Sequence, residues 1–150
     1  MTIVGFAFKK VLAEKEKPII GKTSISNNVS IKDVKESDLN VGQDKASLKF
    51  EFEYTSAFEP GVGKISLVGE LMYLGTSVQV KEILDYWKKK KTLPSNVMID
   101  VINNVLYKCN VEALLLSREV NLPPPIQLPK ATLRQSPQKE KEEKSSSKKK

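Results

Sequence analysis

The feature that most limits the fold of this chain is an apolar helical stripe that runs directly into a proline-rich segment. Between Ser95 and Val120, apolar residues recur at spacings of three and four, which predicts a long helix capped by Ser95. The proline segment, Asn121–Pro129, contains four prolines, which lack a backbone N–H and push the preceding residues toward extended conformations. We therefore expect an extended strap that holds Ile126 and Leu128 over the fold. The predicted stripe comprises Met98, Ile102, Val105, Leu106, Cys109, Ala113 and Leu116.

Four strands are predicted before any helix. Residues 2–13 place Val4, Phe6 and Phe8 on one face, and residues 23–35 place Ile25, Val29 and Ile31 on one face. In the second strand, Asn27 and Asn28 suggest a bulge or kink. The third strand has the clearest alternation, because Leu48, Phe50, Phe52 and Tyr54 are each separated by one polar residue.

The fourth strand, residues 64–74, is apolar on both faces. Its second face carries Val68, Met72 and Leu74. A strand that is apolar on both sides needs cover on both sides, which indicates an interface as well as a core. We therefore expect a homo-oligomer.

A change of period after Gly75 predicts the first helix. Thr76 or Ser77 can cap it, and Val80, Ile83, Leu84 and Trp87 form its apolar face. Four lysines, Lys88 to Lys91, suit the negative end of the helix dipole, although they could also contact RNA or a membrane. Strands followed by helices are typical of an α+β fold, here a four-stranded antiparallel sheet with two C-terminal helices on one face and the proline strap.

The positive charge is concentrated at the C-terminal end. Residues 130–150 carry 8 Lys and Arg against 3 Glu, a net of +5, whereas residues 1–129 carry 17 against 15, a net of +2. We expect residues 1–129 to form one domain and residues 130–150 to be a disordered, Lys/Ser/Glu-rich basic tail. Such a tail attracts RNA or anionic surfaces without sequence specificity, or acts only to keep the protein in solution.

The composition excludes or disfavours several kinds of catalytic and metal site. Because the chain has no histidine, Ser-His and Cys-His catalysis are impossible and transition-metal sites are disfavoured. The one cysteine, Cys109, falls on the apolar stripe, which favours a buried, unreactive thiol. The sequence Gly61-Val62-Gly63-Lys64 joins two strands and does not open a helix, so it does not form a phosphate-binding loop. We expect no enzymatic activity, no metal and no cofactor. Without an apolar run of about 18 residues or a signal peptide, we expect a cytoplasmic protein with no membrane insertion.

The order of these elements resembles that of the SecB export chaperones and their archaeal SecB-like relatives. The similarity is carried by Val105 to Leu116 followed by Leu122 to Pro129, like the final region of that family, in which a helix of small and apolar residues leads into a Phe-Pro-Pro type turn. It extends over residues 2–134. The bacterial proteins are acidic, which helps them bind a basic region of their motor partner, whereas this chain is basic and does not share that charge.

The resemblance implies a non-catalytic chaperone or adaptor that binds extended or unfolded polypeptide in apolar grooves, linked to protein export. Phe50, Phe52 and Tyr54 could equally be the core face of the sheet, and Trp87 a helix-to-sheet anchor. The alternative is a ribosomal or ribosome-associated protein that contacts RNA through Lys88, Lys89, Lys90, Lys91, Lys148, Lys149 and Lys150. The candidate peptide-binding residues are Phe50, Phe52, Tyr54, Met72, Leu74, Trp87, Leu122, Ile126 and Leu128.

Overall fold

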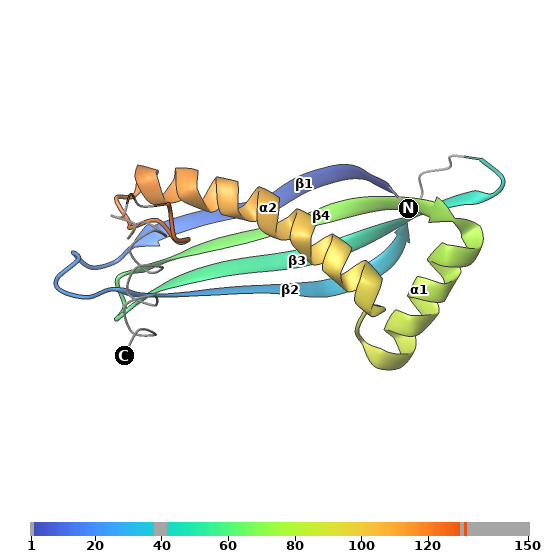
Figure 1. Cartoon of the computed structure of the whole chain (residues 1–150), viewed down its shortest axis with the longest axis horizontal. Coiled ribbons are helices and arrows are strands. Elements are labelled where there is room, and N and C mark those ends of the chain that lie inside the picture. Colours follow the sequence, from blue (N-terminus) through green and yellow to red (C-terminus); the bar gives the residue numbers. More distant parts are fainter. Residues whose placement is uncertain (1, 38–41, 130, 132–150) are drawn as a thin grey trace, which may run out of the picture.

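The fold is a single antiparallel sheet with two helices across one of its faces (Figure 1). The computed structural model describes residues 2–37, 42–129 and 131; the tail predicted for residues 130–150 otherwise lies outside the described residues. The elements are β1 (Thr2–Lys15), β2 (Ser24–Ser37), β3 (Lys45–Glu59), β4 (Gly63–Thr76), α1 (Ser77–Lys90) and α2 (Ser95–Glu119). The strands pair in the order β1-β4-β3-β2, so β1 and β2 are the edges. The α+β class expected from the sequence is confirmed.

The core lies between the helices and the central strands β3 and β4. The predicted alternation of β3 is confirmed, because Leu48, Phe50, Phe52 and Tyr54 are all fully buried. The ring of Phe6 from β1 stacks on Phe52 with centroids 5.1 Å apart. Aromatic packing across three strands therefore fixes the register of one face.

Two bulges correct the predicted pattern of the N-terminal strand. The pairing of β1 with β4 shifts between Ile3 and Gly5, and again between Phe8 and Lys10. The first shift changes the alternation, so Ile3 packs on the core with Phe6, whereas Val4 is 49% exposed. The prediction that Val4 shares a face with Phe6 was therefore wrong.

The bulge predicted in the second strand lies elsewhere. Asn27 and Asn28 pair regularly with Ser56 and Thr55 of β3, and the only shift in the register of these two strands falls between Ile31 and Asp33. The two asparagines were misleading because their residue type favours turns, whereas their position in the ladder is set by the pairing on both sides. The stretch Ser24–Ile31 is thus a regular edge strand.

The helices begin in two different ways. Thr76 caps α1 in a capping box with Gln79, in which each side chain meets the other residue's backbone N–H at 3.2 Å. In α2 the predicted cap was wrong: Pro94 is the N-cap, and its carbonyl accepts from the Met98 N–H at 2.8 Å. Ser95 is the first helical residue. Proline at this boundary needs no N–H partner of its own.

The buried face of α2 follows a strict spacing of four residues. A row with this spacing is inclined to the helix axis, which matches a helix that crosses the sheet diagonally (Figure 1). Val105, Cys109 and Ala113 were predicted correctly, but Met98 and Ile102 lie beside the row and are only half-buried. The stripe in the sequence was wider than the core contact. The buried row consists of Val97, Val101, Val105, Cys109, Ala113 and Ser117.

The open face of the sheet is covered by cross-strand ion pairs. Lys9 of β1 and Lys49 of β3 both reach the Glu70 carboxylate of β4, at 3.2 and 3.3 Å, and Lys9 also reaches Glu51. Desolvation acts to raise the pKa of Glu70, but the two lysines outweigh it and hold that pKa below its usual value. The apolar side chains predicted for this face, Val68, Met72 and Leu74, are half-buried among these residues.

Candidate functional site

One flank of α2 carries no charge over five turns. Between Ser95 and Ser117, the charged residues are Asp100, Lys108 and Glu112, all on one row of the helix just before the buried row. The two rows that follow the buried row hold only apolar side chains and asparagine. We call this surface the uncharged flank; its members are Met98, Ile99, Ile102, Asn103, Leu106, Tyr107, Asn110, Val111, Leu114 and Leu115.

Two contacts show which way each flank faces. On the uncharged flank, the Asn110 amide lies 3.3 Å from the hydroxyl of Tyr54, which belongs to β3. We call the row that carries Asp100, Lys108 and Glu112 the charged flank. On this flank, Asp100 is close enough to Tyr73 of β4 to add to the rise that burial causes in the pKa of Tyr73. Because the sheet order is β1-β4-β3-β2, the uncharged flank faces the β2 side and the charged flank faces the β1 side.

Much of the uncharged flank reaches solvent. Tyr107 is 70% exposed, and Val111 and Leu115, which follow it at spacings of four, are about half exposed. Leu106 packs partly against the core. A soluble helix normally turns charged residues outward, so a continuous apolar row two positions past the buried row indicates a surface that contacts something else.

The proline segment begins where α2 ends and continues toward β2. Asn121 adopts φ 55°, which turns the chain, and Leu122 is buried next to Gly63, the first residue of β4. Pro125 is also buried, whereas Leu128 is about half exposed. The segment therefore lies against the fold at its first residues and leaves the fold after Ile126.

Two hollows flank the exposed part of this segment. One, of about 560 Å³, is lined by Pro124, Ile126, Gln127 and Leu128. The other, of about 500 Å³, lies between the segment and the start of β2, where Thr23, Ile25 and Asn27 form its second wall. Both volumes fall in the range of ligand sites, and among the residues that the structure describes no charged side chain lines either one.

A chain of hydrogen bonds joins α2, the sheet and the proline segment. Asn27 donates through Nδ2 to the Pro125 carbonyl at 2.7 Å, and its Oδ1 accepts from the Ser56 hydroxyl at 2.7 Å. The Ser56 hydroxyl also lies 3.1 Å from that of Tyr54, which in turn meets Asn110. Burial raises the pKa of the Tyr54 phenol, so it stays protonated and available to donate. The side chain of Asn27 is thus the polar tether of the segment.

The predicted peptide-binding residues fall into three groups. Ile126 and Leu128 line a hollow, and Leu74 lines a small separate hollow of about 200 Å³ beside Thr2. Met72 lies on the open face. The other five are buried in the core between the helices and the sheet, so a client does not reach them in this conformation. They are Phe50, Phe52, Tyr54, Trp87 and Leu122.

Residues that sequence reasoning missed complete the surface. Tyr107, Val111 and Leu115 were not among the candidates, although their spacing of four was visible in the sequence. The available signal was an apolar arc on the helix that is wider than a single contact with the sheet requires. Ile25 and Asn27 could not be found in this way, because only the folded chain brings the start of β2 next to the proline segment.

The candidate RNA contacts lie at the other end of the molecule or outside the described residues. Lys88, Lys89 and Lys90 occupy the last turn of α1, and Lys91 ends it in a left-handed conformation. The ammonium group of Lys90 lies 5.0 Å from the ring centroid of Tyr86, so this lysine already has an intramolecular partner. Lys148, Lys149 and Lys150 lie outside the described residues.

Reactive and metal-binding groups are sparse in the described part of the chain. Burial raises the pKa of the Cys109 thiol to about 12, which keeps it protonated and unreactive. Across residues 2–37, 42–129 and 131, no cluster of three or more Cys, Asp or Glu side chains is placed to hold a metal ion. Neither helix among these residues is long and apolar enough to cross a membrane.

Comparison with known proteins shows a similarity to solved structures and no match by sequence. No model of a known protein family matches the chain, and no curated protein matches it. Among solved structures, the chain is similar to the SecB-like chaperone Rv1957 of Mycobacterium tuberculosis, solved in complex with a ChAD peptide from the HigA1 antitoxin. The two share 10% sequence identity with a TM-score of 0.48, over 89% of this chain and 92% of that chain.

Proposed function

We propose that this protein is a non-catalytic, SecB-like chaperone or adaptor that binds extended or unfolded polypeptide. The observation that carries the proposal is the uncharged flank of α2 beside the hollowed proline segment. Extended chains of many sequences share a backbone and scattered apolar side chains. A surface that is apolar, uncharged and bordered by a segment tethered at few points can accommodate them.

The edge strand β2 adds a way to bind the client's backbone. From Ser24 to Ile31, β2 has no charged residue, no proline and no bulge. The opposite edge, β1, has two bulges and carries Lys9 and Lys10 near its centre. Bulges and lysines are the usual protection of a sheet edge, so β2 is the edge open to an added strand.

Charge placed on the uncharged flank tests this proposal. Val111→Lys introduces an ammonium group at an exposed position of that flank, so we expect the protein to lose most of its ability to suppress the aggregation of an unfolded client. The measurement is light scattering of a chemically denatured client after dilution into the protein. Asn104→Lys is the matched control, because it adds the same charge to the same helix on the charged flank.

The two variants together decide the outcome. If Val111→Lys and Asn104→Lys suppress aggregation equally well, the uncharged flank is not the binding surface. If the unmodified protein fails to suppress aggregation at several-fold molar excess, the chaperone proposal itself is wrong. Circular dichroism of both variants establishes that the fold is kept.

The proposal extends to a cytoplasmic location, a link to protein export and self-association. Exposed Tyr107, Val111 and Leu115, together with half-buried Met72 and Leu74, are the apolar surfaces that a second copy could cover. Analytical ultracentrifugation at micromolar concentration tests self-association, and a monomer mass contradicts it. The ribosome-associated alternative is tested by co-sedimentation of the protein with ribosomes at low and high salt. If basic residues contact RNA, the protein should sediment with ribosomes at low salt and stay in the supernatant at high salt.

A further inference from the structure

The outer edge of β2 has two faces of different chemistry. On the core face it presents Ile25, Val29 and Ile31, which pack partly against the core, and Asn27, which holds the proline segment. On the open face it presents only small polar side chains, those of Ser24, Ser26, Asn28 and Ser30. A strand added outside β2 would alternate in the same way, so its side chains would meet apolar neighbours on one face and hydroxyl and amide groups on the other.

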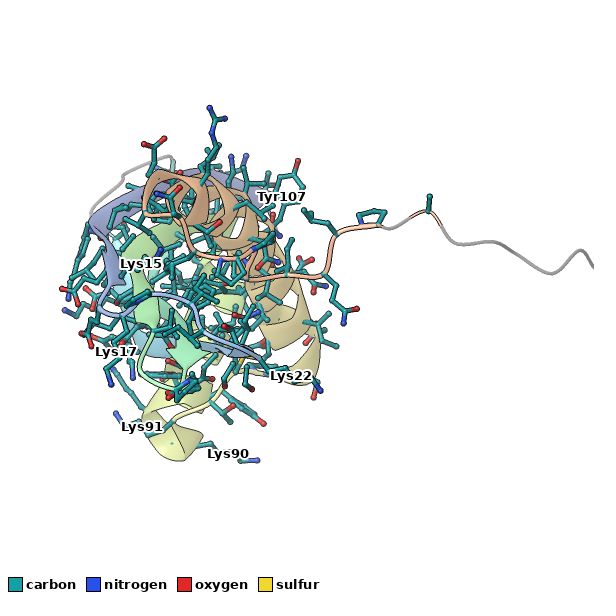
Figure 2. All side chains as sticks on the ribbon, turned by 90° about the vertical axis from the view of Figure 1, so that its left-hand side faces the viewer. Lys15, Lys17, Lys22, Lys90, Lys91 and Tyr107 are labelled. Carbon is teal, nitrogen blue, oxygen red and sulfur yellow. The ribbon has the colours of Figure 1, made fainter. Side chains whose placement is uncertain are left out.

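Cover is present only on the core-face side of this edge. Both helices of the described part of the chain cross the core face (Figure 1), and the uncharged flank of α2 faces β2. Figure 2, which views the molecule from the left-hand side of Figure 1, shows Tyr107 of this flank on the same side as the proline segment. An apolar side chain that an added strand turns toward this side leaves water, whereas one turned toward the open face stays in solvent.

A hollow at the start of β2 gives the core-face side a position for a large side chain. The hollow of about 500 Å³ has Ile25 in one wall and Ile126 of the proline segment in the other. The hydrogen bond of 2.7 Å from Asn27 to the Pro125 carbonyl holds the segment above the strand and keeps the hollow open. An added residue that lies beside Ile25 would therefore turn its side chain into an aliphatic space.

The edge also limits the length and charge of what it can pair with. Its regular, uncharged stretch begins at Ser24 and ends at Ile31, where the register shifts and Lys32 and Asp33 follow. A charged side chain of an added strand would lose water here without meeting an opposite charge, which is unfavourable. The partner that complements this edge is thus neutral over the paired stretch.

We propose that the client segment recognised at this site is a neutral, strictly alternating β-strand, with a large apolar residue at every second position and small polar residues between. This inference rests on the proposed function and names the class of its substrate. The bound strand would continue the sheet order β1-β4-β3-β2 beyond β2. Alternating segments form the half-buried strands of antiparallel sheets, so the clients are β-rich proteins whose sheets have not yet closed.

Two other kinds of segment fit the edge less well. In a continuous apolar segment, every second side chain would remain in water on the open face. In the sequence of an amphipathic helix, apolar residues recur at spacings of three and four, so they cannot all face α2 when the segment is extended. Selection of strands over both kinds follows from the difference between the two faces of β2.

Peptides of identical composition test the proposal with the full-length protein. The alternating probe is Ser-Val-Ser-Leu-Asn-Val-Ser-Leu, and the block probe is Ser-Asn-Ser-Ser-Val-Leu-Val-Leu, both with the same fluorophore and a Gly-Lys-Lys end for solubility. We expect fluorescence anisotropy to show the alternating probe binding about tenfold more tightly, because only its apolar side chains all face the covered side. Equal affinity for the two probes overturns the selectivity.

Backbone methylation of the alternating probe tests pairing at a sheet edge. Alternate residues of a paired strand direct their N–H groups toward the neighbouring strand, so N-methyl groups on one set of alternate residues should abolish binding. N-methyl groups on the other set should leave it nearly unchanged. Equal effects of the two methylated probes would show that the peptide does not bind as an added strand.

A pair of protein variants locates the binding edge. Ile25→Asp places a carboxylate in the wall of the hollow and should weaken the alternating probe about tenfold or more. Val78→Asp is the matched control, because it changes an exposed aliphatic residue of α1 to the same carboxylate and should bind as the unmodified protein does. Equal affinities of the two folded variants, compared by circular dichroism, would remove β2 from the site.

The outcome is distinguishable from that of the proposed function. Suppression of client aggregation together with equal binding of all the probes, or of none, overturns the strand selectivity and leaves the chaperone proposal in place. Failure to suppress aggregation overturns the chaperone proposal. Probe binding that is lost as the protein concentration rises would assign the edge of β2 to a second copy of the chain and overturn its assignment to a client.

Discussion

Asn27 offers the sharpest test of how the proline segment is held. Its side chain makes two hydrogen bonds of 2.7 Å, one donated to the Pro125 carbonyl and one accepted from Ser56. Asn27→Ala removes both at once and leaves the apolar contacts of the segment in place. The change therefore isolates the polar tether from the burial of Leu122 and Pro125.

The expected magnitude follows from the surroundings of each partner. A typical hydrogen bond contributes about 0.5–1.5 kcal/mol net, and water can replace the lost donor at the exposed side of Pro125. Ser56 is fully buried but keeps the Tyr54 hydroxyl as a neighbour at 3.1 Å. We expect Asn27→Ala to lower the free energy of unfolding by about 1–2 kcal/mol, which corresponds to a Tm lower by about 3–6 °C.

Two measurements distinguish a local from a global effect. Denaturant unfolding followed by the fluorescence of buried Trp87, the only tryptophan, gives the change in global stability. Hydrogen exchange of peptides that cover residues 121–129 reports the release of the segment, and it should become faster by more than the global change explains.

The neighbouring asparagine provides the control. Asn28 precedes Val29 in the same regular stretch of β2 but points to the opposite face of the sheet, away from the segment. Asn28→Ala should leave both the unfolding free energy and the exchange of residues 121–129 nearly unchanged. Equal effects of the two substitutions, or an Asn27→Ala protein with native exchange, would show that the segment is held by burial alone.

Two further predictions concern the core. At Gly69 a Cβ would lie 2.4 Å from the Ala7 carbonyl and 2.8 Å from Phe52, so Gly69→Ala should lower the free energy of unfolding, measured with urea, by about 2–3 kcal/mol. Gly5→Ala is the control, because a Cβ there makes only ordinary contacts with Met72 and should leave that free energy nearly unchanged. Equal effects of the two substitutions would contradict the close approach at Gly69. Because burial raises the pKa of Cys109 to about 12 from 9.0, iodoacetamide at pH 8 should label it only in denaturant, as measured by mass spectrometry. The same shift means that the stability Cys109 contributes is complete below about pH 9 and decreases as the pH rises toward 12; rapid labelling of the native protein would contradict both statements.

The sequence predicted the order of elements because each element has a period of its own. Leu48 to Tyr54 alternate, and α1 has both an apolar face and a capping threonine, so neither depends on distant residues. The bulge between Ile31 and Asp33 has no such local signal, because it arises from matching the register of two strands. The same holds for the displacement of Val4.

The site was predicted less well than the fold, for a physical reason. Aromatic residues in a strand with strict alternation, such as Phe50 and Phe52, are as suitable for a core as for a groove, and the helices decide which they become. The start of β2 and the proline segment are about 100 residues apart, as the Asn27–Pro125 hydrogen bond shows with its separation of 98. No periodicity in the sequence reports such a meeting.

The two helices show why the uncharged flank is not a simple result of composition. α1 and α2 cover the same sheet, yet exposed positions of α1 are mostly charged or polar, such as Lys81, Glu82 and Asp85. Between Ser95 and Ser117 of α2 the charges lie on one row, and the exposed row beyond the core is apolar at Tyr107, Val111 and Leu115. The exposed part of this row contributes nothing to folding, since it meets water in the folded and unfolded chain alike. A bound chain that covers this row would remove its apolar surface from water, which is favourable. This gain on binding is the physical basis of the binding proposal.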